Sequence, residues 1–174
     1  MNAAKSGSRA RGPRQHVATI TRALPDDIDA VLALEATCFA EADRFTRPTW
    51  RRLLGHCSRR RTALTLVARS DGRLVGVVCG LLRRGSRVLR VYSLAVDAAC
   101  RGQGLGGRLI RALVAAGPRR CVKASLEVRT DNDSAILLYS RLGFHQAVVL
   151  PRYYPDGGDG LRLSAPRAAI SADR

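Results

Sequence analysis

The chain of 174 residues is long enough for one domain with a substantial hydrophobic core. Its 46% hydrophobic and 25% charged residues are typical of a globular protein and exclude a largely disordered one. No apolar run reaches the roughly 18 residues of a membrane-spanning helix, and the start of the chain lacks an apolar signal core, so we expect a cytoplasmic protein with no membrane partner.

The formal net charge of +16 is carried almost entirely by arginine, since Lys5 and Lys123 are the two lysines. Such a charge raises the question of a nucleic-acid partner. The arginines are scattered along the sequence, however, and few aromatic residues lie among them to stack on bases. Together with the abundant alanine and glycine, they also fit a GC-rich coding bias. We therefore predict a solvated basic surface without dedicated nucleic-acid binding, and transient contact with an RNA-rich particle stays open.

Cysteine and histidine are spaced too widely to suggest a metal site. The cysteines are Cys38, Cys57, Cys79, Cys100 and Cys121, and the histidines are His16, His56 and His145. None of these spacings matches a zinc-ligand pattern, so we expect no metal. An odd, dispersed set of cysteines indicates reduced thiols in a cytoplasm.

The first third of the chain predicts a tail, a strand and two helices. Residues 1–15 are polar and basic without periodic apolar residues, which predicts a disordered tail, and a short strand over 16–23 follows. Asp26 and Asp27 favour the start of a helix, because carboxylates stabilise the positive end of the helix dipole. A second short helix is expected from Pro48, since proline is well tolerated in the first helical turn.

The centre of the chain changes to a two-residue period. Alternating apolar residues over 62–69 and 73–82 predict two antiparallel strands, and the Asp71-Gly72 pair between them is a strong hairpin signal. A third strand is expected over 87–96. These strands form a meander.

The remainder alternates helices and strands. The expected elements are a helix over 105–116, a strand over 122–128, a helix over 133–142 and strands over 144–150 and 160–163. Two strand–helix–strand crossovers attached to a meander predict one α/β domain over residues 16–165, with a mixed sheet and helices on both of its faces. Residues 166–174 are expected to be a flexible tail.

The segment most informative about function is a glycine cluster between the strand over 87–96 and the helix from residue 105. Glycines let the backbone approach a ligand closely, and the N-terminus of the following helix adds partial positive charge, so the segment can hold a diphosphate. It is not a Walker loop, because Gly107 is followed by Arg108 and not by lysine and a hydroxyl residue. A dinucleotide fingerprint is disfavoured because the segment follows a meander.

The run Arg101-Gly102-Gln103-Gly104-Leu105-Gly106 resembles the Arg/Gln-x-x-Gly-x-Gly/Ala signature of the GNAT acetyltransferases. The resemblance implies the GNAT fold, with a mixed and mostly antiparallel central sheet, and acetyl-coenzyme A as co-substrate. It further implies a pyrophosphate site made of Arg101, Gly102, Gln103, Gly104, Leu105, Gly106 and Gly107. The backbone of Leu94, Ala95 and Val96 would pair with the pantetheine arm.

Two candidate acid–base residues lie downstream. Glu127 stands at the carboxyl end of its strand, on the polar face, where ligands of α/β sheets tend to bind. Tyr139 lies six residues into the next helix, about nine Å along its axis. An amine must lose a proton before it attacks a thioester, and general acid–base catalysis contributes about 10²–10⁴-fold. From the residues alone, a solvated glutamate and a core tyrosine are the simpler interpretations.

The stretch from Leu126 to Phe144 resembles more specifically the RimI-type ribosomal-protein alanine N-acetyltransferases, a GNAT branch that acetylates protein N-termini. The resemblance runs through Leu-Glu-Val-Arg, the asparagine after it, Ala-Ile-x-Leu-Tyr and Leu-Gly-Phe. It implies Glu127 as proton acceptor, Tyr139 as proton donor, Asn132 as a coenzyme contact, and Tyr153 and Tyr154 beside the acceptor.

The segment over 38–50 departs from that branch. It is longer and more charged than the family's Phe-Pro-Trp-like turn, and Pro48 and Trp50 are displaced, so the acceptor does not follow from the resemblance. We expect transfer to a protein N-terminal α-amine, with a ribosomal protein as one candidate. The alternatives are a small-molecule amine or a lysine side chain as acceptor, and a non-catalytic module that binds acetyl-CoA or RNA.

Overall fold

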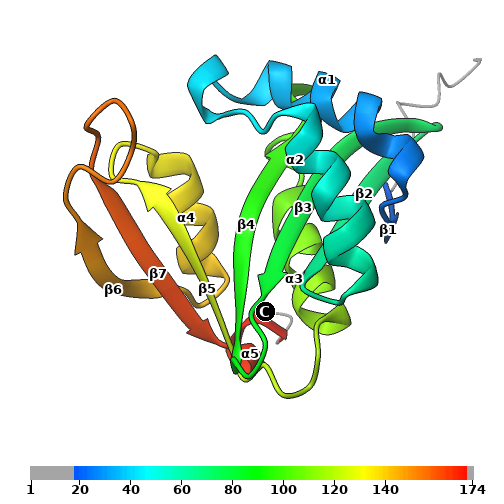
Figure 1. Ribbon diagram of the computed structural model, residues 1–174. Helices are drawn as coiled ribbons and strands as arrows, with labels where there is room; N and C mark the ends of the chain where they lie inside the picture. The colour runs from blue at the N-terminus through cyan, green and yellow to red at the C-terminus, as the bar shows by residue number, and fades with distance from the viewer. Residues whose placement is uncertain (1–17, 172–174) are drawn as a thin grey trace, which may run out of the picture.

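The computed structural model describes residues 18–171, in which a seven-stranded sheet carries helices on both faces (Figure 1). The strands are β1 (Thr19–Arg22), β2 (Ala63–Ser70), β3 (Arg73–Leu82), β4 (Val88–Val96), β5 (Lys123–Arg129), β6 (His145–Leu150) and β7 (Gly160–Pro166). Their order in the sheet is β1-β2-β3-β4-β5-β7-β6. Among the described strands, β4 and β5 pair in parallel and all other neighbours are antiparallel, which confirms the mixed, mostly antiparallel fold. The N-terminal tail over 1–15 lies outside the described residues.

The helical segments also follow the predicted order. The longer ones are α1 (Ile28–Cys38), α2 (Arg47–Arg52), α3 (Leu105–Ala116), α4 (Asp133–Arg141) and α5 (Arg167–Ser171). Short turns are η1 (Pro25–Asp27), η2 (Glu41–Asp43) and η4 (Ala98–Cys100), and η3 (Leu53–Cys57) is a π-helical segment that continues α2. Within residues 18–171 we find no helix with the length and apolar character of a membrane span.

The sheet lies between two hydrophobic clusters, because successive residues of a strand face opposite sides. In β2, Leu64 and Leu66 join the cluster formed with α3 and α4, whereas Ala63 and Val67 join the cluster formed with α1 and α2. Trp50 of α2 is fully buried in the second cluster. The loops that follow β4 and β5 are therefore carried on a sheet that is packed from both sides.

Turn and cap residues act as their chemistry predicts. Asp71 and Gly72 adopt positive φ angles of 49° and 77°, which closes the β2–β3 hairpin. The Asn132 side chain accepts a hydrogen bond from the backbone nitrogen of Ala135 and caps α4.

The end of the chain differs from the sequence prediction. A flexible tail is expected from residue 166, whereas Arg167–Ser171 form α5 and Ile170 is fully buried. Arg167 Nη1 donates to the carbonyl oxygens of Gly117 and Pro118, at 3.1 and 2.9 Å, and so fastens α5 to the end of α3. A segment this short shows too little apolar periodicity to be detected from the sequence.

Candidate active site

Strands β4 and β5 diverge soon after they begin. They pair at three positions, from Val88↔Lys123 to Arg90↔Ser125, and beyond Arg90 they separate, as the green and yellow strands of Figure 1 show. Beyond this point, the edges of β4 and β5 that face each other do not pair. Backbone amides on such an edge can pair with a ligand that carries amide groups of its own.

The glycine loop at the end of β4 has the open backbone that its sequence predicts. Gly102 and Gly104 have φ angles of 74° and 77°, and no atom lies within 4 Å of the position that a Cβ would take on either residue. Arg101 Nε donates to the carbonyl oxygen of Val96 at 3.0 Å, and Gln103 Nε2 donates to that of Ala99 at 3.0 Å. Gly104 caps α3, whose first backbone N–H groups have no partner within the helix.

The last two glycines of the motif also have a packing role. A Cβ on Gly106 would lie 3.2 Å from Leu138, and one on Gly107 would lie 3.7 Å from Leu142, so these positions let α3 approach α4. Leu105 is buried in the core. Helix packing therefore favours glycine at position 106, whereas a Cβ at position 107 would make ordinary contacts.

Glu127 lies where β4 and β5 separate, between two arginines. Its Oε2 accepts a hydrogen bond from Arg90 Nε at 2.7 Å, and its Oε1 accepts one from Arg162 Nε at 2.9 Å. The side chain is 8% exposed. Arg162 stands directly opposite Glu127 in the β5–β7 register, and Arg90 pairs with Ser125, on the same face of β5 two residues earlier. Sequence reasoning missed both arginines, because that register cannot be read from the sequence.

Tyr139 is a buried phenol. It is 8% exposed, and its ring packs against Phe144 with the centroids 5.8 Å apart. Burial, with a smaller contribution from the neighbouring Tyr154, raises the pKa of Tyr139 to about 12. Burial likewise raises the pKa of Tyr154 to about 12, and Glu127 is among the charges that act on it. Tyr154 is thus within electrostatic reach of both candidate acid–base residues, and the Tyr139 phenol is protonated at neutral pH.

The loop between β6 and β7 meets the loop between α1 and α2 at Arg129. The guanidinium carbon of Arg129 lies 4.5 Å from the centre of the Tyr154 ring, and its Nη2 pairs with Asp156 on the same loop. Its Nη1 lies 3.9 Å from Asp43 in η2. On the neighbouring Tyr153, the hydroxyl accepts a hydrogen bond from Arg90 at 3.1 Å. Arg129 of β5 therefore contacts both loops.

The long segment over 38–50 is held by a buried carboxylate that sequence reasoning also missed. Glu35 is 1% exposed, and its Oε2 accepts hydrogen bonds from Trp50 Nε1 at 2.9 Å and from the backbone nitrogen of Phe45 at 3.1 Å. Its Oε1 accepts one from Ser93 at 3.3 Å. Burial raises the pKa of Glu35, and these hydrogen bonds oppose the shift. The Phe45 ring stacks on Tyr92 at 4.8 Å, so the segment closes over β4. The sequence feature that could have identified Glu35 is its position on the apolar face of a predicted helix.

Asn132 is used first as a helix cap. Its Oδ1 accepts hydrogen bonds from Ala135 and from the Ser134 hydroxyl, both at 3.1 Å. The side-chain NH₂ group makes no hydrogen bond within residues 18–171 and can donate to a ligand. Across the same residues, no group of three or more histidine, cysteine, aspartate or glutamate side chains has a metal-binding arrangement.

A model of the acetyltransferase (GNAT) family matches residues 28–144, which is more than half of the chain. The chain belongs to this family. An N-alpha-acetyltransferase of Sulfurisphaera tokodaii is 34% identical over 116 residues, which cover 60% of this chain and 70% of that protein. The N-alpha-acetyltransferase RimI of Mycobacterium tuberculosis is 42% identical over 94 residues, 52% of this chain and 58% of that protein.

The structural neighbours agree with the family assignment. The ribosomal-protein-S18-alanine N-acetyltransferase of Escherichia coli has a TM-score of 0.74 and 26% identity, over 90% of this chain and 96% of that chain. The chain matches 62% or less of the length of the first three curated relatives, a smaller share than for this structure. The GNAT fold and membership are thus established, and they confirm the resemblance read from the glycine loop.

Proposed function

We propose that this protein transfers the acetyl group of acetyl-CoA to a protein N-terminal α-amine, with Glu127 as proton acceptor and Tyr139 as proton donor. One observation carries the proposal. A mostly buried carboxylate stands where β4 and β5 diverge, the glycine loop follows the end of β4, and Tyr139 packs in the cluster that holds Leu126 and Val128, the two neighbours of Glu127 on β5. The relatives at 34% and 42% identity are N-alpha-acetyltransferases, which favours an α-amine as acceptor.

The backbone supports binding of acetyl-CoA along β4 and the glycine loop. The edge that β4 leaves unpaired beyond Arg90 suits the amides of the pantetheine arm, at Leu94, Ala95 and Val96. The loop over 101–107 and the N-terminus of α3 suit the pyrophosphate, because unpaired N–H groups and the helix dipole attract anions. The free NH₂ group of Asn132 is suited to a further contact with the coenzyme.

The chemistry moves two protons. Glu127 takes a proton from the acceptor amine, directly or through one water, as the nitrogen bonds to the thioester carbonyl carbon. Each oxygen of Glu127 accepts one arginine hydrogen bond and retains a lone pair for this proton. When the C–S bond breaks, Tyr139 donates its proton to the sulfur, and coenzyme A leaves as the free thiol. The raised pKa of Tyr139 keeps this proton in place at neutral pH.

The acceptor is proposed to enter between the two loops that meet at Arg129. Tyr153 and Tyr154 stand on one side, and Phe45 and Tyr92 stand on the other. Aromatic walls suit the first side chains of a peptide better than a small polyamine, because they bury apolar surface at little entropic cost. A ribosomal-protein N-terminus in the cytoplasm is an acceptor of this class.

The test follows thiol release from acetyl-CoA with peptides that differ in their first residue. An N-terminally blocked peptide with an internal lysine and a small polyamine are the matched alternatives. We expect turnover with free N-termini and little with the other two.

The roles of the two residues are tested separately from the acceptor. In Glu127→Gln, kcat should fall by about 10²-fold or more while the affinity for acetyl-CoA, measured by calorimetry, is retained. Turnover equal to the wild type in both Glu127→Gln and Tyr139→Phe would remove the acid–base assignment. Preferential acetylation of the polyamine would remove the proposed acceptor.

A further inference from the structure

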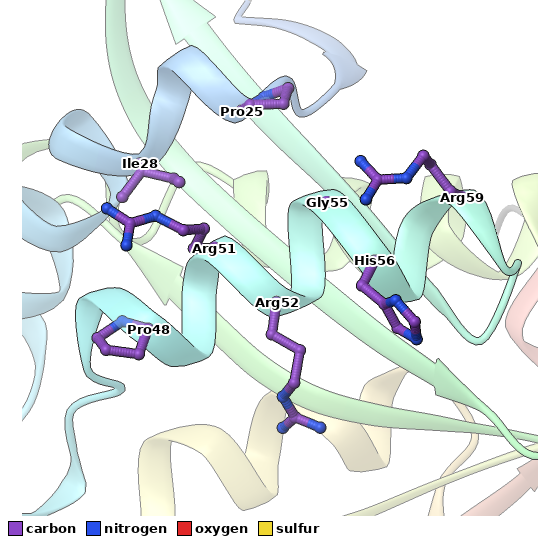
Figure 2. A pocket seen from close by; sticks show the side chains of 8 residues that line it. All are labelled: Pro25, Ile28, Pro48, Arg51, Arg52, Gly55, His56 and Arg59. Carbon is purple, nitrogen blue, oxygen red and sulfur yellow. The ribbon is translucent and has the colours of Figure 1, made fainter.

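A basic hollow lies apart from the candidate active site, between the start of α1 and the helical segment α2–η3 (Figure 2). Its volume is about 490 Å³. Pro25 and Ile28 give it an apolar side, and Arg51, Arg52, His56 and Arg59 give it a basic one. Figure 2 shows Arg51 beside Ile28 and Arg59 on the side of Pro25. None of the residues that line it belongs to β4, β5 or the glycine loop.

The hollow holds a surplus of positive charge. The run over 51–61 contains five arginines, one histidine and no acidic residue. Arg51, Arg52 and Arg59 are exposed, and within residues 18–171 they form no ion pair.

The nearby carboxylates do not cancel this charge. Asp27 pairs with Arg69 and Asp29 pairs with Arg47. Asp26, next to Pro25 in the chain, is exposed and adds one negative charge. The arginines of this one run of the sequence therefore keep a net positive charge around the hollow.

The backbone under this surface is unusual. Residues Leu53–Cys57 form a π-helical turn, and Leu53 and Leu54 anchor it in the core. Such π-helical turns are rare and occur frequently at functional sites. Gly55 lies within the turn and lines the hollow, and a Cβ there would approach Arg59 Nη1 at 3.7 Å. The turn thus leaves the hollow free of a side chain at its centre.

We propose that this hollow and its flanking arginines bind the phosphate backbone of RNA. The guanidinium group matches phosphate oxygens in a two-pronged geometry, and a row of such groups fits a repeating polyanion better than a single ion. Aromatic residues for base stacking are absent from the residues that line the hollow, so the contact is independent of base sequence. The choice of RNA rests on the proposed function, because a ribosomal-protein acceptor is presented on an RNA-rich particle.

The test measures the affinity of the full chain for a fluorescein-labelled RNA hairpin by anisotropy over a series of KCl concentrations. The variant is Arg51→Gln/Arg59→Gln. The matched control is Arg83→Gln/Arg84→Gln, which removes the same charge from the exposed turn between β3 and β4. The hollow variant should bind about tenfold more weakly or worse. The slope of log K against log [salt] is negative, and its magnitude should decrease by about 2, since each lost phosphate contact removes about 0.9. The control should change the affinity by less than about twofold.

Several results would overturn the proposal. Equal losses in the hollow variant and its control would mean that overall charge, and not this surface, holds the RNA. A poly-glutamate peptide that binds as tightly as the hairpin would identify an acidic protein surface as the partner. Peptide acetylation without RNA should be the same in the wild type and the hollow variant. If RNA binding is lost and peptide acetylation is unchanged, the substitution has affected the hollow alone. If acetylation is lost and RNA binding is unchanged, the substitution has affected the active site.

Discussion

At Glu127, one carboxylate meets two guanidinium groups. Arg90 comes from β4 and Arg162 from β7, and each binds a different oxygen. A charge that is mostly buried needs such partners, because desolvation otherwise destabilises it by several kcal/mol. The setting separates Glu127 from an ordinary solvated glutamate on a strand, which is the simpler interpretation of the sequence.

The buried phenol of Tyr139 yields a prediction for alkaline stability. Its pKa is about 12 in the folded protein and about 10 in the unfolded chain. The folded state therefore holds this proton more tightly, and its contribution to stability is complete below pH 10 and is lost as the pH rises toward 12. At two pKa units the contribution is at most roughly 2.7 kcal/mol.

Tyr139→Phe should lose less stability than the wild type between pH 10 and 12, as measured by urea denaturation. At neutral pH the variant should fold normally, because the ring keeps its contact with Phe144. Its kcat should nevertheless fall by about 10²-fold if the phenol is the proton donor. Tyr92→Phe, which removes a half-buried hydroxyl, serves as the control. Identical alkaline curves for the wild type and Tyr139→Phe would contradict the pKa shift.

Among the elements, the segment from α1 to α2 depends most on one side chain. Glu35 joins α1 to the turn before α2 through Phe45 and Trp50, and it joins both to β4 through Ser93. The wall that faces Tyr153 and Tyr154 is therefore set by a buried carboxylate and not by a proline turn. Of the charged residues in this segment, Glu41 and Asp43 lie in η2, and Arg44 follows it and acts on the charge of Glu35.

Two substitutions at Glu35 should separate hydrogen bonding from charge. Glu35→Gln keeps an oxygen for Trp50 and Phe45 and turns its NH₂ group toward the Ser93 hydroxyl, which can accept. Its free energy of unfolding should stay within about 1 kcal/mol of the wild type. Glu35→Ala leaves three donors without a partner and opens a cavity, so it should lose about 3 kcal/mol or more. Equal effects of the two changes in thermal denaturation would show that the hydrogen bonds contribute little.

Local sequence signals account for most of the elements and few of the contacts between them. Asp71-Gly72 closes the predicted hairpin, and a helix begins at Leu105 after the glycine cluster as predicted, because glycine readily adopts the positive φ angles found at Gly72 and Gly104. The π-helical turn and α5 were missed, because neither has a periodic apolar pattern of sufficient length.

For the candidate site, the sequence brought Glu127 and Tyr139 forward through family resemblance, and their catalytic roles stay predictions. The roles of Arg90, Arg162 and Glu35 could not be predicted from the sequence. The contacts of the two arginines with Glu127 depend on strand register, and the contact of Glu35 depends on the chain turning back so that Trp50 reaches α1. Gly106, predicted to be part of a phosphate site, also lets Leu138 of α4 pack closely against α3. The sequence shows that small residues are needed there but does not show for which reason.

At the scale of the whole molecule, the sheet consists of two parts joined at a narrow parallel junction. Strands β1–β4 form one part and β5-β7-β6 the other, and three residue pairs connect them along β4 and β5. Arg129 adds a second connection on the open side through Asp43. Arg90 of β4 also joins the two parts, through its hydrogen bonds to Glu127 and Tyr153.

Arg129→Gln should weaken acceptor binding more than coenzyme binding. The change removes the ion pairs to Asp156 and Asp43 and the cation–π contact with Tyr154, so the two loops lose the side chain that both contact. The KM for a peptide acceptor should rise by about fivefold, and the Kd for acetyl-CoA should be unchanged. Arg141→Gln, an exposed arginine of α4, is the charge-matched control. A parallel rise in the Kd for acetyl-CoA would place the effect in the coenzyme site instead.

The position of β7 has a consequence for how the protein is made. It is the last strand of the chain, yet it lies between β5 and β6 and provides Arg162 opposite Glu127. During translation, β5 keeps an open edge until residues as far as Pro166 have been synthesised, so the part of the sheet that carries the carboxylate closes only at the end. A nascent chain that already holds the whole β1–β4 meander and the glycine loop therefore still lacks Arg162, and the surroundings of Glu127 are complete only when β7 has paired with β5.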